Sequence, residues 1–302
     1  MIASRPYSDD YDRIMDFLRE MYLRTKIQRC WLPQKWEYAE YLVNPMYMEP
    51  AGGGWPHWHT SIRIWEEDGR IVAVCHNKSG NDAFLQIRPG YEHLTDEMLD
   101  YAEEVITADM GGERRLTVWS TESNKHLNDR LASRGYPRDD GGQYFNAQYL
   151  DKDYIPQLPE GYSFADGCQV EDQLDRQNAV SEGFDHGPAR EVSAGFASME
   201  KAPLFRPDLE IMTRHSDGTL SSFCVVWYDP AINIGMFEPV ATHPDHRRLG
   251  LGREMLTEGL RRLKAIGAER AFVESYGDNR KAFYNSAGFE TFDNDRHWTK
   301  RF

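Results

Sequence analysis

Apolar residues recur at strand and helix spacings along the second half of the chain. These patterns predict strands over residues 162–166, 209–215, 219–229, 232–242, 270–275 and 297–302. They predict helices over residues 170–184, 189–200, 253–267 and 279–288. In the third of these helices, Leu256, Leu260 and Leu263 share one face, and Gly267 is a suitable C-terminal stop.

The first half repeats this order of elements loosely. A hairpin is expected over residues 61–77 with its turn at Asp68 and Gly69, followed by a strand (82–88), a helix (95–111), a strand (114–120), a helix (124–136) and a strand (142–150). We therefore predict a duplicated unit, with one domain over residues 1–152 and another over 153–302. The polar, proline-containing stretch 151–161 joins them.

Charge and length exclude several classes of partner. The 302 residues include 35 basic and 49 acidic side chains, a formal net charge of −14, and the acidic excess is shared by both halves. Such a surface argues against nucleic acid or an anionic membrane as a partner. No apolar run approaches a membrane span, and the N-terminal segment carries acids where a signal peptide is apolar. We expect a cytoplasmic protein.

One basic segment stands out against this acidic background. Arg247 and Arg248 directly precede Gly250 and Gly252, where a strand runs through a tight loop into a helix. The first amides of a helix have no partner inside it and point outward with the positive end of the dipole. Glycine lets that backbone approach a bulky anion. The segment indicates a phosphate or pyrophosphate ligand, although by itself it is equally compatible with a basic surface turn.

The surroundings of this loop resemble the GCN5-related N-acetyltransferase superfamily. Arg247, Gly250 and Gly252 fit the family's Arg/Gln-x-x-Gly-x-Gly/Ala loop, and residues 238–247 are similar to its fourth strand running into the loop. The family's downstream helix motif is matched by Asn279, Ala282, Tyr284, Gly288 and Phe289. The resemblance implies an α/β fold of two tandem domains, each a mostly antiparallel twisted sheet flanked by helices, with splayed central strands.

The family binds acetyl-coenzyme A where the fourth and fifth strands splay apart, and the resemblance transfers this site to particular residues. The backbone of Val240, Ala241 and Thr242 is expected to pair with the pantetheine arm, and Asn279 and Phe283 to contact the cofactor. The expected pyrophosphate loop consists of Arg247, Arg248, Leu249, Gly250, Leu251, Gly252 and Arg253.

Two residues are candidates for the chemistry of acyl transfer. The family would use Tyr284 as the general acid that protonates the thiolate; a tyrosine hydroxyl, with an ordinary pKa of about 10, is protonated at neutral pH. Glu238 lies two residues before Val240, so strand alternation places it on the same face, where it is a possible general base or an anchor for a substrate ammonium. A structural carboxylate is an equal alternative, and Glu274 ranks third.

The histidines and cysteines do not predict a metal site. His243 and His246 precede the glycine loop without an evident third ligand, and His57 and His59 lie in an aromatic, glycine-rich stretch. The four cysteines show no metal-ligand spacing.

The first half departs from the family at the position of the loop. Gly90 is followed by Glu92, Asp96 and Glu97 near the start of the expected helix. Carboxylates there satisfy the helix amides and repel a pyrophosphate. We expect that this half does not bind the cofactor. The aromatic segment 30–59 is either a wall of the substrate site or a cover for the first sheet.

The leading hypothesis is therefore an N-acetyltransferase that moves acetyl from acetyl-coenzyme A to a primary amine of a small molecule or peptide. One alternative is an acyl-coenzyme A sensor or scaffold without catalysis. Another is an acyltransferase that uses a different acyl donor or a hydroxyl acceptor. Monomer and homodimer both remain open, since tandem halves can satisfy within one chain an interface that single domains make by dimerising.

Overall fold

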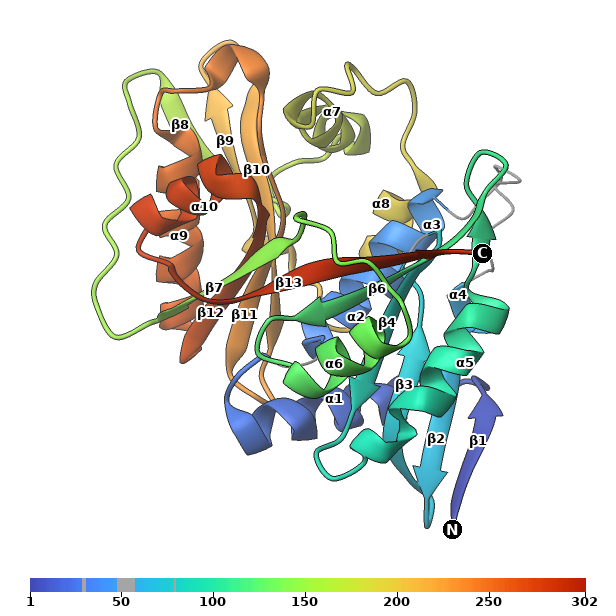
Figure 1. Ribbon diagram of the computed structural model, residues 1–302. Helices are drawn as coiled ribbons and strands as arrows, with labels where there is room; N and C mark the ends of the chain where they lie inside the picture. Colours follow the sequence, from blue (N-terminus) through green and yellow to red (C-terminus); the bar gives the residue numbers. More distant parts are fainter. Residues whose placement is uncertain (29–30, 48–57, 79) are drawn as a thin grey trace. The chain divides into compact units, whose positions relative to one another are not determined.

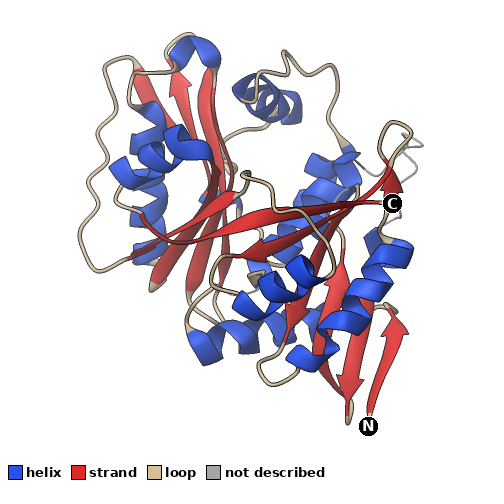
Figure 2. Ribbon diagram, viewed as in Figure 1, coloured by secondary structure: helices blue, strands red, loops and turns tan. Residues whose placement is uncertain are grey.

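The computed structural model describes residues 1–28, 31–47, 58–78 and 80–302, and these form two compact units (Figures 1 and 2). Unit 1 comprises Met1–Tyr144 and Asp293–Phe302, and unit 2 comprises Phe145–Phe292. Each unit is a mixed sheet with helices packed against it. The α/β class predicted from the sequence is confirmed.

Unit 1 contains a sheet in which β1, β2, β3, β4, β6 and part of β13 are neighbours in that order, with β5 paired to β6. Its strands are β1 (Ile2–Pro6), β2 (Arg63–Glu67), β3 (Arg70–His76), β4 (Asp82–Ile87), β5 (Ala108–Asp109) and β6 (Arg114–Thr121). Its helices are α1 (Tyr11–Thr25), α2 (Pro33–Tyr38), α3 (Asn44–Tyr47), α4 (Trp58–Ser61), α5 (Thr95–Val105) and α6 (Lys125–Ser133), with short π and 3-10 segments η1 (Ala39–Val43) and η2 (Glu92–Leu94).

The core of unit 1 lies between this sheet and the helices α5 and α6. Leu116 and Val118 of β6 are fully buried against Met98 and Leu99 of α5 and Leu131 of α6. Among the described strands of unit 1, β4 and β6 pair in parallel, as expected for two strands joined through a helix, and the other pairs are antiparallel. The predicted hairpin turn at Asp68 and Gly69 is confirmed; both residues have positive φ angles, 51° and 77°.

Unit 2 contains a sheet in which β7, β12, β11, β10, β9 and β8 are neighbours in that order. Its strands, apart from β7, are β8 (Tyr162–Asp166), β9 (Glu210–His215), β10 (Leu220–Asp229), β11 (Ile234–Thr242) and β12 (Arg270–Tyr276). Its helices are α7 (Gln173–Gly183), α8 (Ala194–Met199), α9 (Leu251–Ala265) and α10 (Gly277–Ser286), with 3-10 turns η3 (Pro207–Leu209) and η4 (Pro244–His246).

Helices cover both faces of the unit 2 sheet (Figure 1). Cys224 and Val226 of β10 belong to the same buried cluster as Leu256 of α9. Phe223, which alternates with them, packs on Phe196 of α8 with ring centroids 6.3 Å apart. The amphipathic helix predicted over 253–267 is thus confirmed as α9, and its apolar face is the one that the leucine spacing indicated.

The closing strands β7 (Gln143–Tyr149) and β13 (Glu290–Arg301) are divided between the units. The end of β13 pairs antiparallel with β6 of unit 1, and most of β7 is a neighbour of β12 in unit 2. Each half of the sequence therefore ends on a strand that enters the sheet of the other compact unit. The domain boundary after residue 152 stays a prediction about the duplicated sequence units, because it does not coincide with the division into compact units.

Three sequence-based boundaries are wrong. The final strand, expected over 297–302, already begins at Glu290 as β13. The helix expected over 189–200 begins only at Ala194, where the Ser193 side chain accepts a hydrogen bond from the Phe196 amide and so caps the first turn. The helix expected to continue to residue 111 ends at Val105, and Ala108–Asp109 pair with β6 instead. Of the aromatic segment 30–59, the described part forms short helices; residues 30, 48–57 and hence His57 lie outside the described residues.

Helix α9 approaches β11 closely because a glycine lies on each side of the contact, Gly259 on α9 and Gly235 on β11. A Cβ atom on Gly259 would lie 2.5 Å from a ring carbon of Phe237, and one on Gly235 would lie 2.5 Å from a methyl carbon of Leu263. Both distances are below any real contact, so neither position has space for a larger side chain. This close packing fixes the helix whose N-terminus forms the cleft described below.

We predict that Gly259→Ala destabilises the protein by about 1–3 kcal/mol, although alanine is the better helix former, because overpacking outweighs propensity. Urea denaturation followed by tryptophan fluorescence measures the effect. Thr257→Ala, half-buried on the same helix, is the control and should change stability by less than about 1 kcal/mol. A Gly259→Ala protein as stable as the wild type would show that α9 can move away from β11.

Candidate active site

A break in strand pairing opens the centre of the unit 2 sheet. β11 and β12 pair in parallel from Ile234 and Arg270 as far as Phe237 and Val273. Both strands continue past that point, β11 to Thr242 and β12 to Tyr276. On its other side β11 stays paired with β10 as far as Thr242. The last residues of β11 therefore present one backbone edge toward the gap between the strands.

A β-bulge in β11 marks the position of this break. Cys224 of β10 is paired with Val240, but Val226 is paired with Phe237, so Glu238 and Pro239 together oppose one residue. Pro239 has no amide hydrogen to donate to a neighbouring strand. The bulged backbone is held by the Trp227 indole, whose Nε1 donates to the Glu238 carbonyl at 2.6 Å.

The loop between β11 and α9 has the conformation that its sequence indicated. Gly250, at the N-cap of α9, lies in the left-handed region with φ 83°, and Arg248 has φ 68°. No side chain caps the first turn of α9. A Cβ atom on Gly252 would lie 3.1 Å from the Phe283 ring and 3.2 Å from the Thr242 hydroxyl, so glycine keeps this approach open.

These elements enclose a cleft of about 760 Å³ within unit 2. Its lining includes the following predicted site residues: Val240, Ala241, Thr242, Arg247, Arg248, Gly250, Leu251, Gly252, Arg253, Asn279, Phe283 and Tyr284. The structure thus brings together segments that are about forty residues apart in the sequence. Within this unit, which is described throughout, Leu249 and Glu238 are the two predicted residues that are not part of the lining.

The three arginines of the loop differ in what holds them. The Arg247 guanidinium donates to the Thr242 carbonyl, the Gly183 carbonyl and the Asp185 carboxylate, each at 3.0 Å. Arg253 pairs with Glu254 at 2.9 Å. No ion pair joins the exposed Arg248 to any carboxylate in the described part of the chain. Of the three, Arg248 is therefore the cation best able to serve an anionic ligand.

Tyr284, which lines the cleft, interacts electrostatically with Glu238, which does not line it. Burial raises the pKa of the Tyr284 hydroxyl well above its ordinary value, and the Glu238 carboxylate raises it further. The hydroxyl therefore stays protonated across the physiological range. The predicted shared face of Glu238 and Val240 is wrong as an inference from alternation, because the bulge lies between them and the register places Phe237 on the face of Val240.

The comparisons with known proteins agree with this geometry. A family model described as Acetyltransferase (GNAT) family matches residues 178–289, which include the whole cleft. The mycothiol acetyltransferase of Saccharomonospora viridis is 28% identical over 254 residues, covering 74% of this chain and 78% of the relative.

The chain is an acyltransferase, and its residues 178–289 match the GNAT family.

Solved structures extend the likeness of this acyltransferase to both units. A GCN5-related N-acetyltransferase from Sphaerobacter thermophilus matches with a TM-score of 0.66 at 15% identity, covering 99% of this chain and 95% of that one. A tandem GNAT protein from the clavulanic acid biosynthesis pathway matches with a TM-score of 0.65 at 16% identity, covering 100% and 98%. At these identities the likeness concerns the fold, and the predicted tandem GNAT architecture is confirmed.

Several residues of the acyltransferase's cleft were missed by the sequence analysis. They are Gly183, Phe184, Asp185, His246, Arg280 and Ser286. A Cβ atom on Gly183 would lie 2.6 Å from that of Ala241, so the end of α7 reaches the cleft only because residue 183 is glycine. No short-range motif marks residues 183–185, which contact Arg247 over more than sixty positions in the sequence.

The position in unit 1 that corresponds to the glycine loop is occupied by acidic side chains. The Gly90 amide donates to the Glu92 carboxylate at 2.9 Å, and Glu97 accepts from the Trp65 indole at 2.8 Å. Asp96 forms an ion pair with Arg130. Of these carboxylates Glu92 accepts from a loop amide, whereas Glu97 and Asp96 bind side chains, and α5 has no side-chain cap, contrary to the expectation that carboxylates satisfy its amides. Their negative charge would repel a pyrophosphate. That unit 1 does not bind the cofactor stays a prediction.

Three histidines form a cluster at one end of the acyltransferase's cleft. The ring of His246 lies 5.3 Å from that of His243 and 5.4 Å from that of His215, and its Nδ1 is 2.8 Å from the Tyr162 hydroxyl. Of the other two histidines that the sequence analysis considered and did not assign to a metal, His59 is described, and its ring contacts Glu40 at 2.8 Å. In the described residues no group of three or more His, Cys, Asp or Glu side chains is placed to hold a metal ion.

None of the helices in the described part of the chain is long and apolar enough to span a membrane.

We predict that unit 2 loses stability as the pH falls below about 6.5, partly through His246. Burial lowers the pKa of His246, and the neighbouring His243 and His215 lower it further against the opposite effect of Asp217 and Asp245. The unfolded chain therefore takes up this proton before the folded chain does. Urea midpoints at about pH 7.5 and about pH 5.5 should differ less in His246→Gln than in the wild type. The control, His186→Gln at an exposed position, should keep the wild-type difference; equal pH dependence in both variants would contradict the role of His246.

Proposed function

We propose that this acyltransferase transfers an acetyl group from acetyl-coenzyme A to a primary amine of a small molecule or peptide. The observation that carries the proposal is the cleft of about 760 Å³ in unit 2, where a backbone edge, a helix start and a buried tyrosine hydroxyl converge. The acetyl transfer named for the Saccharomonospora viridis relative supports the same reaction here.

The cleft residues fit the parts of acetyl-coenzyme A. The edge of β11 at Val240, Ala241 and Thr242 offers backbone groups with which the amides of a pantetheine arm can pair like an added strand. Asn279 and Phe283 of α10 line the other side, with a polar amide and an aromatic ring.

The loop and the start of α9 supply what a pyrophosphate needs. The amides from Leu249 to Gly252 and the positive end of the α9 dipole favour an anion, and Arg248 adds a full charge. We assign Arg247 a different role from the one expected, because its guanidinium already joins the end of β11 to the end of α7. Arg247 shapes the loop, and Arg248 carries the charge.

The reacting groups are assigned to Tyr284 and Glu238. The acceptor reacts as the neutral amine, and as its nitrogen forms a bond to the acetyl carbon it loses one proton to Glu238, directly or through a water molecule; that proton returns through solvent to the Tyr284 oxygen after the transfer. As the carbon–sulfur bond breaks, the Tyr284 hydroxyl donates its proton to the sulfur, and coenzyme A leaves as a free thiol. Burial of Tyr284 beside a carboxylate keeps that proton in place until the sulfur becomes negative.

We predict that Tyr284→Phe lowers kcat for thiol release about 10²- to 10⁴-fold, as expected for the loss of a general acid, and changes the Kd for acetyl-coenzyme A less than about threefold. Free thiol is measured with acetyl-coenzyme A and a broad panel of primary amines, and binding is measured by calorimetry. Tyr149→Phe, at an exposed tyrosine, is the control and should keep wild-type turnover.

Two outcomes of this experiment decide between the hypotheses. Turnover by Tyr284→Phe equal to the wild type would remove Tyr284 from the mechanism. Tight binding of acetyl-coenzyme A by the wild type, with no thiol released over any amine, would contradict acetyl transfer to amines and favour the alternative of an acyl-coenzyme A sensor.

We predict that Arg248→Glu raises the Kd for acetyl-coenzyme A about tenfold or more, because a charge-assisted contact to phosphate is replaced by repulsion. The effect should shrink as salt is added, since the side chain is exposed. Lys201→Glu, an exposed cation of the same unit outside the cleft, is the charge-matched control. Equal Kd values for the two variants would show that the phosphates do not lie at Arg248.

A further inference from the structure

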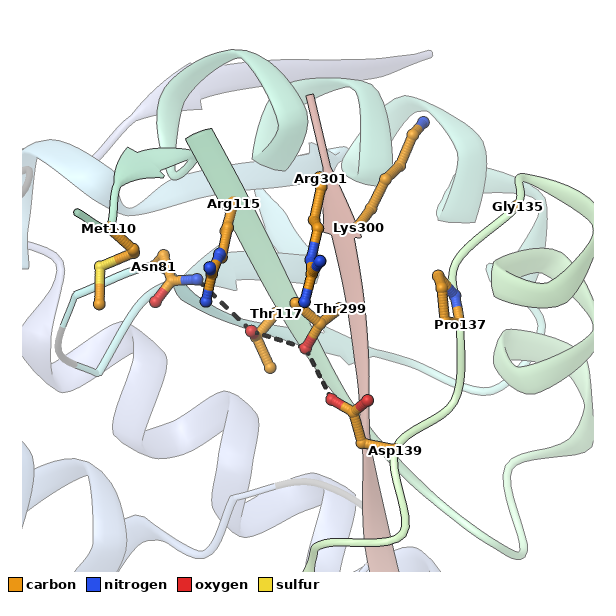
Figure 3. A pocket seen from close by; sticks show the side chains of 10 residues that line it. All are labelled: Asn81, Met110, Arg115, Thr117, Gly135, Pro137, Asp139, Thr299, Lys300 and Arg301. Carbon is orange, nitrogen blue, oxygen red and sulfur yellow. Dashed lines mark hydrogen bonds between the residues drawn. The ribbon is translucent and has the colours of Figure 1, made fainter. Parts of the chain in front are cut away.

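A second cavity, of about 620 Å³, lies entirely within unit 1 (Figure 3). It is located beside Asn81, which precedes β4, and beside Arg115 and Thr117 at the beginning of β6. These are the amino ends of the two parallel strands, whereas the cleft in unit 2 lies at the carboxyl ends of its parallel pair. The cavity is therefore not the unit 1 counterpart of the candidate active site.

The register between β6 and β13 places two arginines side by side in this cavity. Arg115 is directly opposite Arg301, and Thr117 is directly opposite Thr299. These residues share one face of the sheet, because Leu116, between Arg115 and Thr117, and Trp298, directly before Thr299, belong to the core on the other face. Like charges at directly opposed positions repel each other.

One carboxylate forms ion pairs with both arginines. Glu113 lies 2.5 Å from Arg115 and 3.6 Å from Arg301. Lys300 points away from the pair, as Figure 3 shows, and forms its ion pair with Glu103 at 3.2 Å. One end of the cavity thus keeps a positive charge that Glu113 does not neutralise.

The floor of the cavity carries hydrogen-bond acceptors and a negative charge instead. Thr299 donates its hydroxyl hydrogen to the Asp139 carboxylate at 2.9 Å, and the Thr117 hydroxyl lies 3.0 Å from the Thr299 oxygen. Because the Thr299 hydroxyl donates its hydrogen to Asp139, the Thr117 hydroxyl must be the donor in the hydrogen bond between the two threonines. The Asn81 side-chain amide in turn donates to the Thr117 oxygen at 3.4 Å. Both hydroxyl hydrogens are used, so the floor offers oxygen lone pairs, and these lead to Asp139 (Figure 3).

The charges of the cavity cancel overall but are separated in space. The lining carries three cations, Arg115, Lys300 and Arg301, and one carboxylate, Asp139. Two further carboxylates lie outside the lining: Glu113 pairs with Arg115 and Arg301, and Glu103 pairs with Lys300. The three positive and three negative charges cancel, and Asp139 accepts from Thr299 rather than from an arginine. A phosphate dianion would leave an excess of negative charge. A ligand with no net charge, an anionic group at one end and a hydrogen-donating cation at the other, matches both ends.

We propose that this cavity binds a small zwitterion of the free amino acid class. Its carboxylate accepts hydrogen bonds from Arg115 and Arg301, and its ammonium group donates to Asp139 and to the threonine oxygens. The site lies outside the acyl-transfer cleft and gives unit 1, which has acids in place of a cofactor loop, a binding role of its own.

Calorimetric titration of the full-length protein with each of the twenty common amino acids tests the proposal. At least one should bind, and its N-acetyl and amide derivatives, which each lack one charge, should bind about tenfold more weakly or worse. Arg115→Gln and Asp139→Asn should each weaken binding of the amino acid by a similar factor. The control is Arg114→Gln, because this exposed neighbour alternates to the other side of β6 and should leave the Kd unchanged.

Three results would overturn the proposal: no amino acid binds, a derivative lacking one charge binds as tightly as its parent, or binding survives unchanged in Asp139→Asn. The third result would mean that the amino acid occupies another site, such as the acceptor position of unit 2. If Arg115→Gln does not fold, the derivatives and Asp139→Asn still decide, since Asp139 is exposed and its replacement keeps a hydrogen-bond acceptor for Thr299.

Discussion

The active-site cleft depends on one constraint, which is that β11 pairs with β12 over only part of its length. The pairing stops at Phe237 and Val273, and the bulge at Glu238 and Pro239 follows directly. If the parallel pairing continued, it would close the edge of Val240–Thr242, and α9 would begin over a filled sheet. The cleft lining, the orientation of the glycine loop and the position of Tyr284 all follow from this one interruption.

The packing of α9 against β11 holds the start of the helix in place at the cleft. Gly259 and Gly235 allow the helix to lie against β11, and the leucines of its apolar face belong to the same buried cluster as Tyr284. A rigid helix start is what makes unpaired amides useful for binding, since they cost no reorganisation when an anion arrives. Arg247 completes the support, because its guanidinium joins three segments of unit 2 around the loop. We therefore assign structural charge to Arg247 and propose that Arg248 supplies the charge for binding.

Features encoded within a short stretch were predictable from the sequence, and features created by long-range pairing were not. The loop at Gly250 and the helix α9 follow from local spacing and turn chemistry, and both are where the pattern placed them. The bulge at Glu238 was not predictable, because the alternation of residues along a strand does not show in the sequence where an extra residue is inserted. The roles of Arg247 and Gly183 depend on contacts across more than sixty positions, and the exchange of β7 and β13 between units requires knowledge of strand partners. The two opposed arginines of unit 1 could not be predicted either, because their pairing depends on the register between β13 and β6.

The central claim is that a single cleft, in unit 2, holds the acyl donor against the exposed edge of β11. A crystal structure of the full-length protein with acetyl-coenzyme A tests it most directly. The account predicts one bound molecule, with its pantetheine arm beside Val240–Thr242, its pyrophosphate at the start of α9 next to Arg248, and its sulfur within hydrogen-bonding reach of Tyr284. Acetyl-coenzyme A bound in unit 1, or bound in unit 2 with its sulfur remote from Tyr284, would contradict it.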